Sequence, residues 1–350
     1  MQQKTLTVVV PTYNMEKYLR RCLDSLIVDD ERMAQLEVLV VNDGSKDTSS
    51  AIAHEYEKKY PGTFRVIDKE NGNWGSCINR GIKEATGKYL RLLDSDDRYD
   101  KDSFVKLISS LSETDADMVL TNYCIDYGKR KRFCSLPNTI KFGQSYRIED
   151  LKREQIDVPF FQMHSITYKL SVIREVNLTL QEGISYTDTE FVFYPLAAVK
   201  KILPLDICLY YWTLGREGQT SSSEKMLEMI DDRYKTTKRV LDDYIKEKNT
   251  GSAQREYQAA LVTLTMGVYY SVILTIDKTD AEERRARELY DLMKTGAPEL
   301  LVVMRRKYVR RNGFRYHYFR VWEDTGKYMS NFPYCMINML NGVRKLIKGE

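Results

Sequence analysis

The sequence predicts an α/β fold, in which a mostly parallel β-sheet is flanked by helices and is followed by a smaller helical domain. Two observations carry this prediction. Up to residue 214, short apolar runs typical of buried strands alternate with stretches of helical periodicity. After the Gly/Ser-rich segment 215–223, the periodicity is helical. We therefore expect an α/β domain over residues 1–222 and an α-helical domain over residues 223–350 that ends in a basic, aromatic tail.

The predicted strands are short apolar runs rich in β-branched residues. Apart from the hydroxyl of Thr7, Leu6–Val10 is apolar and mostly β-branched, which is the pattern of a strand buried on both faces. The same reasoning predicts further strands at Glu37–Val41, Phe64–Ile67, Tyr89–Leu93, Asp117–Tyr123 and Pro204–Trp212. The basic run 128–132 is expected to form an exposed hairpin tip.

Amphipathic stretches between these strands predict the helices of the first domain. Leu19, Cys22, Leu23 and Leu26 follow the spacing of one helical face, and similar stripes lie at 77–85 and 104–111. We expect Asn14 to cap the first helix and Asp47 to cap the second, because both residue types favour the N-cap position. Gly87 is expected to end the third helix.

Polar clusters follow three of the predicted strands, at residues 11–14, 42–45 and 94–97. In parallel α/β sheets, ligands bind where the carboxyl ends of the strands meet. We therefore expect these three clusters to converge on one binding crevice.

Composition excludes several classes of protein. The chain has 350 residues, of which 43% are hydrophobic and 30% charged, as in ordinary globular proteins with about two domains. A net charge of +4 does not indicate nucleic-acid binding. The six cysteines show no paired spacing, so neither zinc nor disulfides are predicted. A strand-like run already begins at Leu6, and no run of about 18 apolar residues occurs, so we expect a cytoplasmic protein.

The cluster Asp94-Ser95-Asp96-Asp97 is the most informative for chemistry. Three carboxylates within four residues repel one another unless a cation lies among them. Oxygen ligands of this kind suit Mg²⁺ or Mn²⁺, which commonly bridge to the phosphates of a substrate. The alternative is a capped turn, since Asp and Ser both favour turns.

Several segments, taken in order, resemble the family 2 glycosyltransferases. The matching segments are Val8–Asn14, Val40–Asp47, Asn71–Gly81, Gly87–Tyr89 and Leu93–Asp97. Together they span roughly residues 5 to 125. The resemblance implies a nucleotide-sugar-binding GT-A fold, which is a Rossmann-like, mostly parallel sheet flanked by helices.

The resemblance also implies roles for individual residues. Tyr13 would stack on a uracil ring, and Asp43 would accept the hydrogen bond of the uracil N3. Asp96 would bind the Mn²⁺ or Mg²⁺ ion that bridges the diphosphate, and Asp94 would approach the ribose or the metal. The other nucleotide-sugar-binding residues that it implies are Pro11, Thr12, Asn71, Asn79 and Ser95.

Two later segments extend the resemblance. Thr187–Phe191 is similar to the family's Glu-Asp-x-x-Phe motif, with threonine in the glutamate position, and this implies that Asp188 deprotonates the acceptor hydroxyl. The alternative is that Asp188 caps a helix beginning at Thr189, and both roles can coexist. The segment Tyr210–Ser221 resembles the family's closing segment, which implies that Arg216 binds the diphosphate. The alternative for Arg216 is a place in a surface linker.

Three positions leave two interpretations open. Ile78 stands where the family often has arginine, so it either packs in the core or marks a phosphate contact that Arg80 takes over. Trp74 either covers a sugar or is an ordinary buried loop tryptophan. His164 is either a structural histidine or a contact to the metal or the acceptor.

The resemblance implies an inverting, metal-dependent glycosyltransferase, of the hexosyl- or N-acetylhexosaminyl-transferase type. Its donor would be a UDP-sugar or another nucleoside-diphosphate sugar, and its acceptor a hydroxyl of a glycan, such as a lipid-linked glycan or a cell-surface polysaccharide precursor. One alternative is a nucleotidyltransferase, although Pro11–Asn14 is not the glycine-rich basic loop that such enzymes use. The other is a non-catalytic nucleotide-sugar-binding module, against which the presence of Asp94, Asp96 and Asp188 argues.

The C-terminal segment is basic and aromatic. From Leu301 to Glu350 there are eleven Lys or Arg residues and three acidic ones. The aromatic residues Phe314, Tyr316, Tyr318, Phe319 and Trp322 lie among these cations, and apolar residues within Pro333–Lys348 fall near helical spacing. These residues either pack on the helical domain or lie on an anionic membrane. We hypothesise reversible peripheral attachment to the cytoplasmic face of the membrane.

Overall fold

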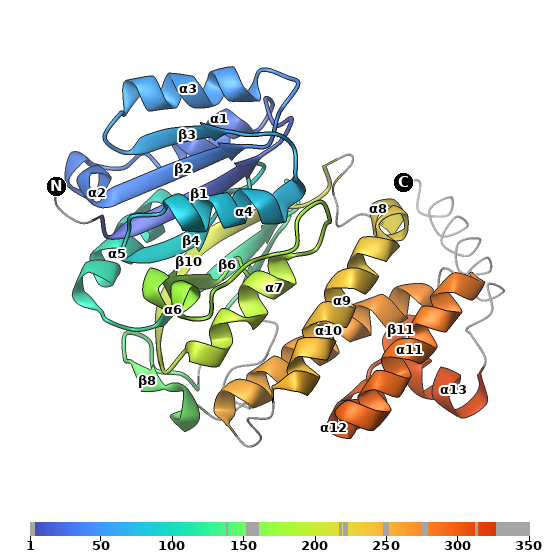
Figure 1. The fold of residues 1–350 in the computed structure, drawn as a ribbon. Helices are drawn as coiled ribbons and strands as arrows, with labels where there is room; N and C mark the ends of the chain where they lie inside the picture. Colours follow the sequence, from blue (N-terminus) through green and yellow to red (C-terminus); the bar gives the residue numbers. More distant parts are fainter. Residues whose placement is uncertain are drawn as a thin grey trace. The chain divides into compact units, whose positions relative to one another are not determined.

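The computed structural model describes residues 4–137, 139–151, 161–216, 219, 223–247, 252–274, 279–311 and 314–326 (Figure 1). The chain forms two compact units. The first comprises Met1–Ser222 together with Asn249–Gln258, and the second comprises Ser223–Lys248 together with Ala259–Glu350. The described residues 252–258 thus belong to the first unit, although they follow the Gly/Ser-rich stretch. The domain division at residues 222 and 223 stays a prediction.

A ten-stranded sheet forms the centre of the first unit, as far as the described residues show. Strands β3, β2, β1 and β4 are parallel neighbours, and β6 and β10 form a further parallel pair. Strand β9 joins β4 to β6 with antiparallel pairing on both sides. The main path of the sheet runs β3 (Phe64–Asp68), β2 (Leu36–Asn42), β1 (Leu6–Thr12), β4 (Tyr89–Leu92), β9 (Ile166–Lys169), β6 (Met118–Asp126), β10 (Lys201–Thr213) and β5 (Arg98–Tyr99).

Short strands and helices complete the first unit. Strand β7 (Lys131–Cys134) pairs with β6 and forms the exposed hairpin expected around 128–132, and β8 (Tyr146–Arg147) pairs with β10. Helix α4 packs against β1 and β2, and α5 packs against β10. The helices are α1 (Leu19–Asp24), α2 (Asp30–Gln35), α3 (Ser49–Lys59), α4 (Asn73–Glu84), α5 (Lys101–Glu113), α6 (Leu170–Glu175) and α7 (Asp188–Phe193), with 3-10 turns at Ile148–Asp150 and Pro195–Ala198.

The predicted α/β architecture is confirmed, with corrections at three helix ends. Asp47 is not the N-cap of α3, which is Thr48, although Asp47 Oδ1 accepts from Ser49 N at 2.9 Å. Asn14 does not cap α1, because that helix begins at Leu19 after Tyr18. Asn14 instead adopts a positive φ of 53°, and its side-chain oxygen accepts a hydrogen bond from Lys46 N at 2.7 Å. Gly87 does not end α4, since the helix stops at Glu84.

Gly87 is required for close packing of β1 beside the start of β4. A Cβ at this position would lie 2.6 Å from Thr7 N and 2.8 Å from the carbonyl carbon of Leu6. Both are backbone atoms of β1, so they cannot move without disturbing its pairing with β2 and β4. We expect Gly87→Ala to lower the free energy of unfolding by about 1–3 kcal/mol, the usual cost of overpacking. Urea denaturation checks this, with Gly62→Ala as the control because nothing lies within 4 Å of its added Cβ.

The second unit is helical and has an aromatic core. Tyr244, Tyr269 and Tyr270 are buried, and so are Phe319 and Trp322. The rings of Tyr270 and Phe319 meet edge to face with centroids 4.9 Å apart. The elements are α8 (Ser223–Glu228), α9 (Ile230–Lys246), α10 (Ala253–Ile273), whose first residues pack with the first unit, α11 (Asp280–Gly296), α12 (Pro298–Met304), β11 (Val309–Arg311), β12 (Phe314–Tyr316) and α13 (Tyr318–Thr325).

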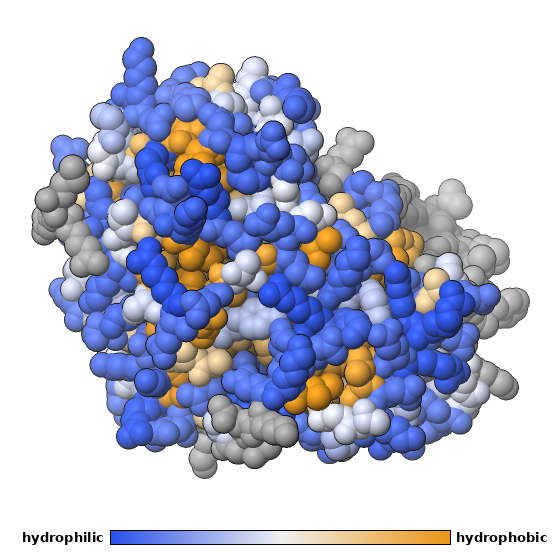
Figure 2. Space-filling view, in the orientation of Figure 1, coloured by the Kyte–Doolittle hydropathy of each residue, from blue (hydrophilic) through white to orange (hydrophobic). Residues whose placement is uncertain are grey.

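The aromatic residues of α13 pack inside the second unit. Tyr318, Phe319 and Trp322 are at most 4% exposed, so the packing interpretation holds for them and the membrane-facing one is wrong. The predicted amphipathic helix within 333–348 lies outside the described residues. Of the described helices, none combines the length and apolar character that crossing a membrane requires. Figure 2 shows one face of the molecule, on which hydrophilic side chains predominate and hydrophobic ones form separate patches.

Candidate active site

Three loops meet at the carboxyl ends of the parallel strands. The register of β1 and β2 runs from Leu6 opposite Leu36 to Thr12 opposite Asn42, so the two strands end side by side. Asp43 N then donates to Thr12 O at 2.8 Å, and Asn14 N donates to Ser45 Oγ at 3.0 Å. The predicted convergence of the clusters 11–14 and 42–45 is therefore confirmed.

Asp43 lies in a set of hydrogen bonds near the exposed ring of Tyr13. The Asp43 side chain is buried, and its Oδ1 accepts from Lys69 Nζ at 2.6 Å and from Gly72 N at 3.0 Å. Asn71 donates its side-chain amide to Asp43 O at 3.0 Å. Tyr13 is 45% exposed, so its face is accessible. Lys69 was not predicted, although its position directly after β3 is the signal that could have identified it.

The three carboxylates 94, 96 and 97 differ in surroundings. Asp97 is buried and accepts hydrogen bonds from Tyr210 Oη and Thr213 N, both at 2.6 Å, so it holds the end of β10 to this turn. Burial, with the nearby charges of Asp96 and Asp94, raises its pKa well above the ordinary range. Burial and repulsion from Asp96 also raise the pKa of Asp94, to about 7. Negative charge is therefore crowded at this point, as expected for a site that takes a cation.

Arg216 supplies a cation to Asp96. Its Nε and Nη2 lie 2.9 and 2.8 Å from Asp96 Oδ2, and its guanidinium lies over the ring of Tyr18 at 5.7 Å. Arg21 donates to the backbone oxygen of Asp96 at 2.5 Å. A guanidinium thus occupies the oxygen that was predicted to bind the metal, which shows that this position accepts positive charge.

Asp94 and Asp96 fit a divalent cation that takes its other ligands from a substrate. Among the described residues, no three His, Cys, Asp or Glu side chains are arranged to hold a metal by themselves. Mg²⁺ is commonly bound by one or two carboxylates together with substrate phosphates. The two aspartates, the local crowding of charge and the guanidinium on Asp96 match that kind of site.

Asp188 lies in the same site, at the first residue of α7. It is half-buried, and its charge contributes to the raised pKa of Asp94, so the two carboxylates are neighbours. The N-cap of α7 is Thr187, so the alternative in which Asp188 caps a helix from Thr189 is wrong. Glu190 is buried and accepts from Gln181 N at 2.9 Å and Gln181 Nε2 at 2.5 Å. This carboxylate fixes the loop before α7 and was not predicted.

The start of α4 joins the loop before α7 to Asp94. Trp74 Nε1 donates to Asp94 Oδ1 at 2.8 Å. The neighbouring Gly75 packs so closely that a Cβ would lie 2.1 Å from Gln181 O. Trp74 is half-buried, and its contact was not among the roles predicted for it. The indole N–H satisfies one oxygen of Asp94, and the other oxygen has no hydrogen-bond partner among the described residues.

We expect Trp74→Phe to lower kcat by about 10-fold to 100-fold. The change keeps an aromatic ring but removes a hydrogen bond to a charged group, which is worth about 1.5–3 kcal/mol. Steady-state kinetics with the sugar donor proposed below measures the change in kcat. Trp322→Phe is the matched control, because Trp322 belongs to the second unit and its indole nitrogen has no partner among the described residues. Equal kinetics of Trp74→Phe and the wild type would show that this bond does not position Asp94.

Other predicted residues near the site make structural contacts. Asn79 exchanges two hydrogen bonds with the backbone of Leu180, at 2.8 and 2.9 Å, and its contact with a donor stays a prediction. Ile78 is fully buried, which agrees with core packing, and Arg80 is exposed and pairs with Glu84 at 3.0 Å. The remaining predicted residues are Pro11, Thr12 and Ser95, which are buried at the ends of β1 and β4.

His164 is a buried aromatic packing residue. Its ring stacks between Tyr123 and Trp212, with centroids 5.5 and 4.8 Å away, and meets Tyr210 edge to face. Burial and the charge of Arg91 lower the pKa of His164 to about 3. The imidazole is therefore neutral near pH 7, and the structural interpretation fits this environment.

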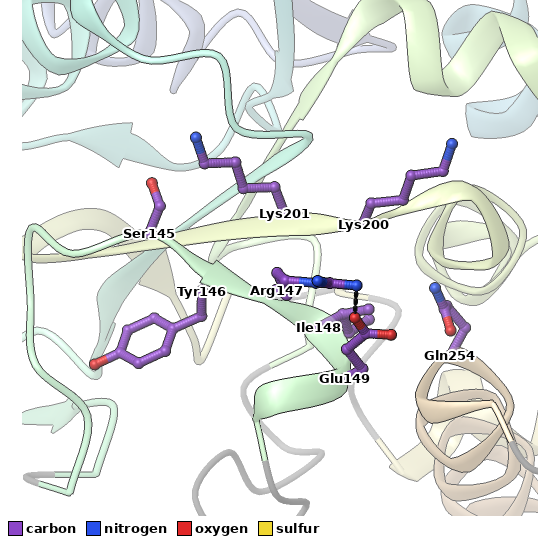
Figure 3. A pocket seen from close by; sticks show the side chains of 8 residues that line it. All are labelled: Ser145, Tyr146, Arg147, Ile148, Glu149, Lys200, Lys201 and Gln254. Carbon is purple, nitrogen blue, oxygen red and sulfur yellow. Dashed lines mark ion pairs between the residues drawn. The ribbon is translucent and has the colours of Figure 1, made fainter.

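A separate cavity of about 480 Å³ lies where β10 begins (Figure 3). Lys201 is the first residue of β10 and lies opposite Arg147 of β8, while the predicted active site lies at the other end of the strand, beside Thr213. Figure 3 shows Arg147 paired with Glu149. None of the predicted site residues lines this cavity, whose walls are Ser145, Tyr146, Arg147, Ile148, Glu149, Lys200, Lys201 and Gln254.

Comparison with known proteins gives a consistent result. Residues 7–176 match the family described as glycosyl transferase family 2. The uncharacterized glycosyltransferase MG025 homolog of Mycoplasma pneumoniae is 30% identical over 226 residues, which cover 63% of this chain and 72% of that protein. The uncharacterized glycosyltransferase MG025 of Mycoplasma genitalium is 35% identical over 202 residues, which cover 55% of this chain and 66% of that protein.

The fold is similar to a solved structure of Staphylococcus aureus TarS. Residues 1–349 of TarS, in complex with UDP-GlcNAc, align with a TM-score of 0.61 over 85% of this chain and 83% of that chain. At 19% identity, this likeness is one of fold.

Proposed function

Because the chain belongs to glycosyl transferase family 2 and is a glycosyltransferase with a GT-A fold, we propose that it transfers a sugar from a UDP-sugar to a glycan hydroxyl with inversion at the anomeric carbon. The observation that carries the proposal is the convergence of Asp43, Asp94 and Asp188 on one edge of the sheet. These residues come from three loops far apart in sequence, and each has a chemistry that the reaction needs.

The donor subsite is proposed at Tyr13 and Asp43. The exposed face of Tyr13 suits stacking of a base, and Asp43 is held in place by Lys69 and Gly72. The fold is similar to that of TarS, which has been solved with UDP-GlcNAc, and this supports a uridine nucleotide. We propose that the transferred sugar is a hexose or an N-acetylhexosamine.

A Mn²⁺ or Mg²⁺ ion is proposed at Asp96, with Asp94 beside it. When bound, such an ion neutralises charge on the diphosphate of the leaving group. Arg216 pairs with Asp96 in this structure, and its guanidinium has the bidentate geometry that phosphate oxygens require. We propose that Arg216 moves from Asp96 to the diphosphate when the donor binds.

The proposed reaction is a single displacement. Asp188 accepts the proton of the acceptor hydroxyl, and the acceptor oxygen forms a bond to the anomeric carbon from the face opposite the diphosphate. The bond from that carbon to the diphosphate oxygen breaks, and its electron pair leaves with UDP. We propose that Arg216 stabilises that charge, since electrostatic contacts contribute most to catalysis where charge develops.

The acceptor is proposed to be a glycan, including a lipid-linked glycan or a polysaccharide precursor. A lipid-linked acceptor would be met at the cytoplasmic face of a membrane, which agrees with the proposed peripheral attachment through the basic C-terminal segment. A nucleotidyltransferase and a non-catalytic sugar-nucleotide-binding module are the alternatives that the experiment below must exclude.

A thermal-shift screen with UDP-sugar hydrolysis tests the proposal. We expect UDP to raise Tm in Mn²⁺ more than in EDTA, because a ligand that binds the native state stabilises it by mass action. Other nucleoside diphosphates serve as controls. Release of UDP from one of several UDP-sugars separates a transferase from a binding module. Release of pyrophosphate from a nucleoside triphosphate would instead identify a nucleotidyltransferase.

A further inference from the structure

The hairpin of β11 and β12 places two arginines directly opposite each other. The antiparallel register pairs Arg310 with Arg315, between the pairs Val309–Tyr316 and Arg311–Phe314. Directly opposed residues of an antiparallel pair project from the same face of the hairpin. Arg310 and Arg315 are both exposed. Like charges in this arrangement destabilise a hairpin, so their presence calls for an explanation outside the fold.

The surroundings of this pair supply little negative charge. In the sequence, residues 301–322 contain seven Lys or Arg and no Asp or Glu. Arg305 pairs with Glu323 at 2.6 Å, and Arg320 lies 3.6 Å from Asp324. No carboxylate of the described residues forms an ion pair with Arg310 or Arg315. Their charges are therefore available to an external anion.

An exposed aromatic ring adjoins the pair. The guanidinium of Arg315 lies over the ring of Tyr308, 4.9 Å from its centroid. Tyr308 is 39% exposed and is one of only five large hydrophobic side chains exposed in the described part of the chain. The hairpin thus presents two guanidinium groups beside an amphipathic ring, whereas the aromatic residues of α13 are buried.

We propose that this hairpin face, defined by Tyr308, Arg310 and Arg315, binds the phosphate groups of anionic lipids at a membrane surface. Guanidinium groups bind phosphate in bidentate geometry, and a bilayer presents many phosphates in one plane. Tyrosine side chains favour the headgroup level of a membrane, which a soluble phosphate polymer lacks. The inference relies on the proposed function for its biological purpose, since a surface-bound enzyme would meet a lipid-linked acceptor there.

Vesicle sedimentation of the full chain tests this site. We expect the wild type to sediment with vesicles of phosphatidylglycerol and phosphatidylcholine at low salt, and to remain in the supernatant with phosphatidylcholine alone. Arg310→Gln/Arg315→Gln should weaken binding at least about 10-fold. The matched control is Lys129→Gln/Arg130→Gln, which removes two exposed charges from the β6–β7 hairpin of the first unit and should bind like the wild type.

Other outcomes overturn the assignment. If Arg344→Gln/Lys345→Gln abolishes binding while the hairpin variant binds normally, the tail and not the hairpin is the membrane site. A wild type that stays in the supernatant at low salt, or that binds soluble polyphosphate but no vesicle, also contradicts the proposal. Hydrolysis of a UDP-sugar in solution should be equal in the wild type and in Arg310→Gln/Arg315→Gln. Loss of vesicle binding can therefore be distinguished from a failure of the proposed transferase activity.

Discussion

Asp188→Asn is expected to lower kcat by at least about 10²-fold and to leave UDP affinity nearly unchanged. Asparagine keeps the size of the side chain but cannot accept a proton near neutral pH, and a lost general base typically costs about 10²–10⁴ in rate. The base acts on the acceptor in the transition state, so donor binding in the ground state does not depend on it. Asp188 is the first residue of α7. Asparagine is tolerated in the first turn of a helix, so the substitution should leave α7 folded.

Kinetics and calorimetry together check this expectation. Asp115→Asn is the control, because it makes the same chemical change at a side chain that is 71% exposed and pairs with Lys169 outside the site. Asp188→Asn should bind UDP like the wild type in Mn²⁺ while its kcat falls. Retention of more than about a tenth of wild-type kcat would mean that another residue deprotonates the acceptor. Equal loss in the Asp115 variant would point to a general effect of folding.

The positions of several strands could be predicted because they depend on local patterns. Apart from Thr7 and Glu37, the runs at Leu6–Val10 and Glu37–Val41 are apolar, and such runs are typical of buried strands. The order of the strands was not predicted, because it depends on which strands pair across the sheet. Strands β9 and β5 were not predicted, since β9 is four residues and β5 two residues long, and each is defined by its partners in the sheet.

The site could be predicted only in part, because sequence motifs indicate which residues are functional but not which side chains they contact. The sequence indicates that Asp43, Asp96 and Asp188 are functional, as all three follow predicted strands or resemble a family motif. The partners Lys69 and Trp74 are 26 and 20 residues away from the carboxylates that they contact, and no local pattern links them. The same holds for the pair of Arg216 and Asp96, which are 120 residues apart.

The packing of the C-terminal aromatic residues was ambiguous for a related reason. A helix with apolar residues on one face can bury that face in protein or in lipid, and its sequence is the same in both cases. The structure shows that α13 buries its apolar face in protein, since Phe319 lies against Tyr270 and Tyr290 of other helices. The exposed cations of β11 and β12 became informative only when the register placed Arg310 opposite Arg315.

Asp96→Ala is expected to abolish the metal dependence of UDP binding. If Asp96 holds the cation that bridges the diphosphate, its removal should weaken UDP binding in Mn²⁺ by at least about 10-fold to 100-fold, the loss that even supporting residues of metal sites cause. Binding in EDTA should change little, because Tyr13 and Asp43 are not altered. The substitution also removes the partner that Arg216 has in this structure. In this variant Arg216 can approach the diphosphate without breaking an ion pair. This should favour UDP binding in EDTA and offset any loss of affinity there.

Calorimetric titration with UDP, in Mn²⁺ and in EDTA, separates these contributions. Asp102→Ala is the control, because Asp102 is an exposed residue in the first turn of α5 and lies outside the carboxylate cluster. The decisive quantity is the ratio of the two affinities for each protein, since a general loss of stability would lower both. If the ratio of UDP affinity in Mn²⁺ to that in EDTA is the same in Asp96→Ala and in the wild type, Asp96 is not the metal ligand. Tighter binding in EDTA, together with a ratio near one, would mean that the ion pair with Arg216 competes with the donor for this arginine.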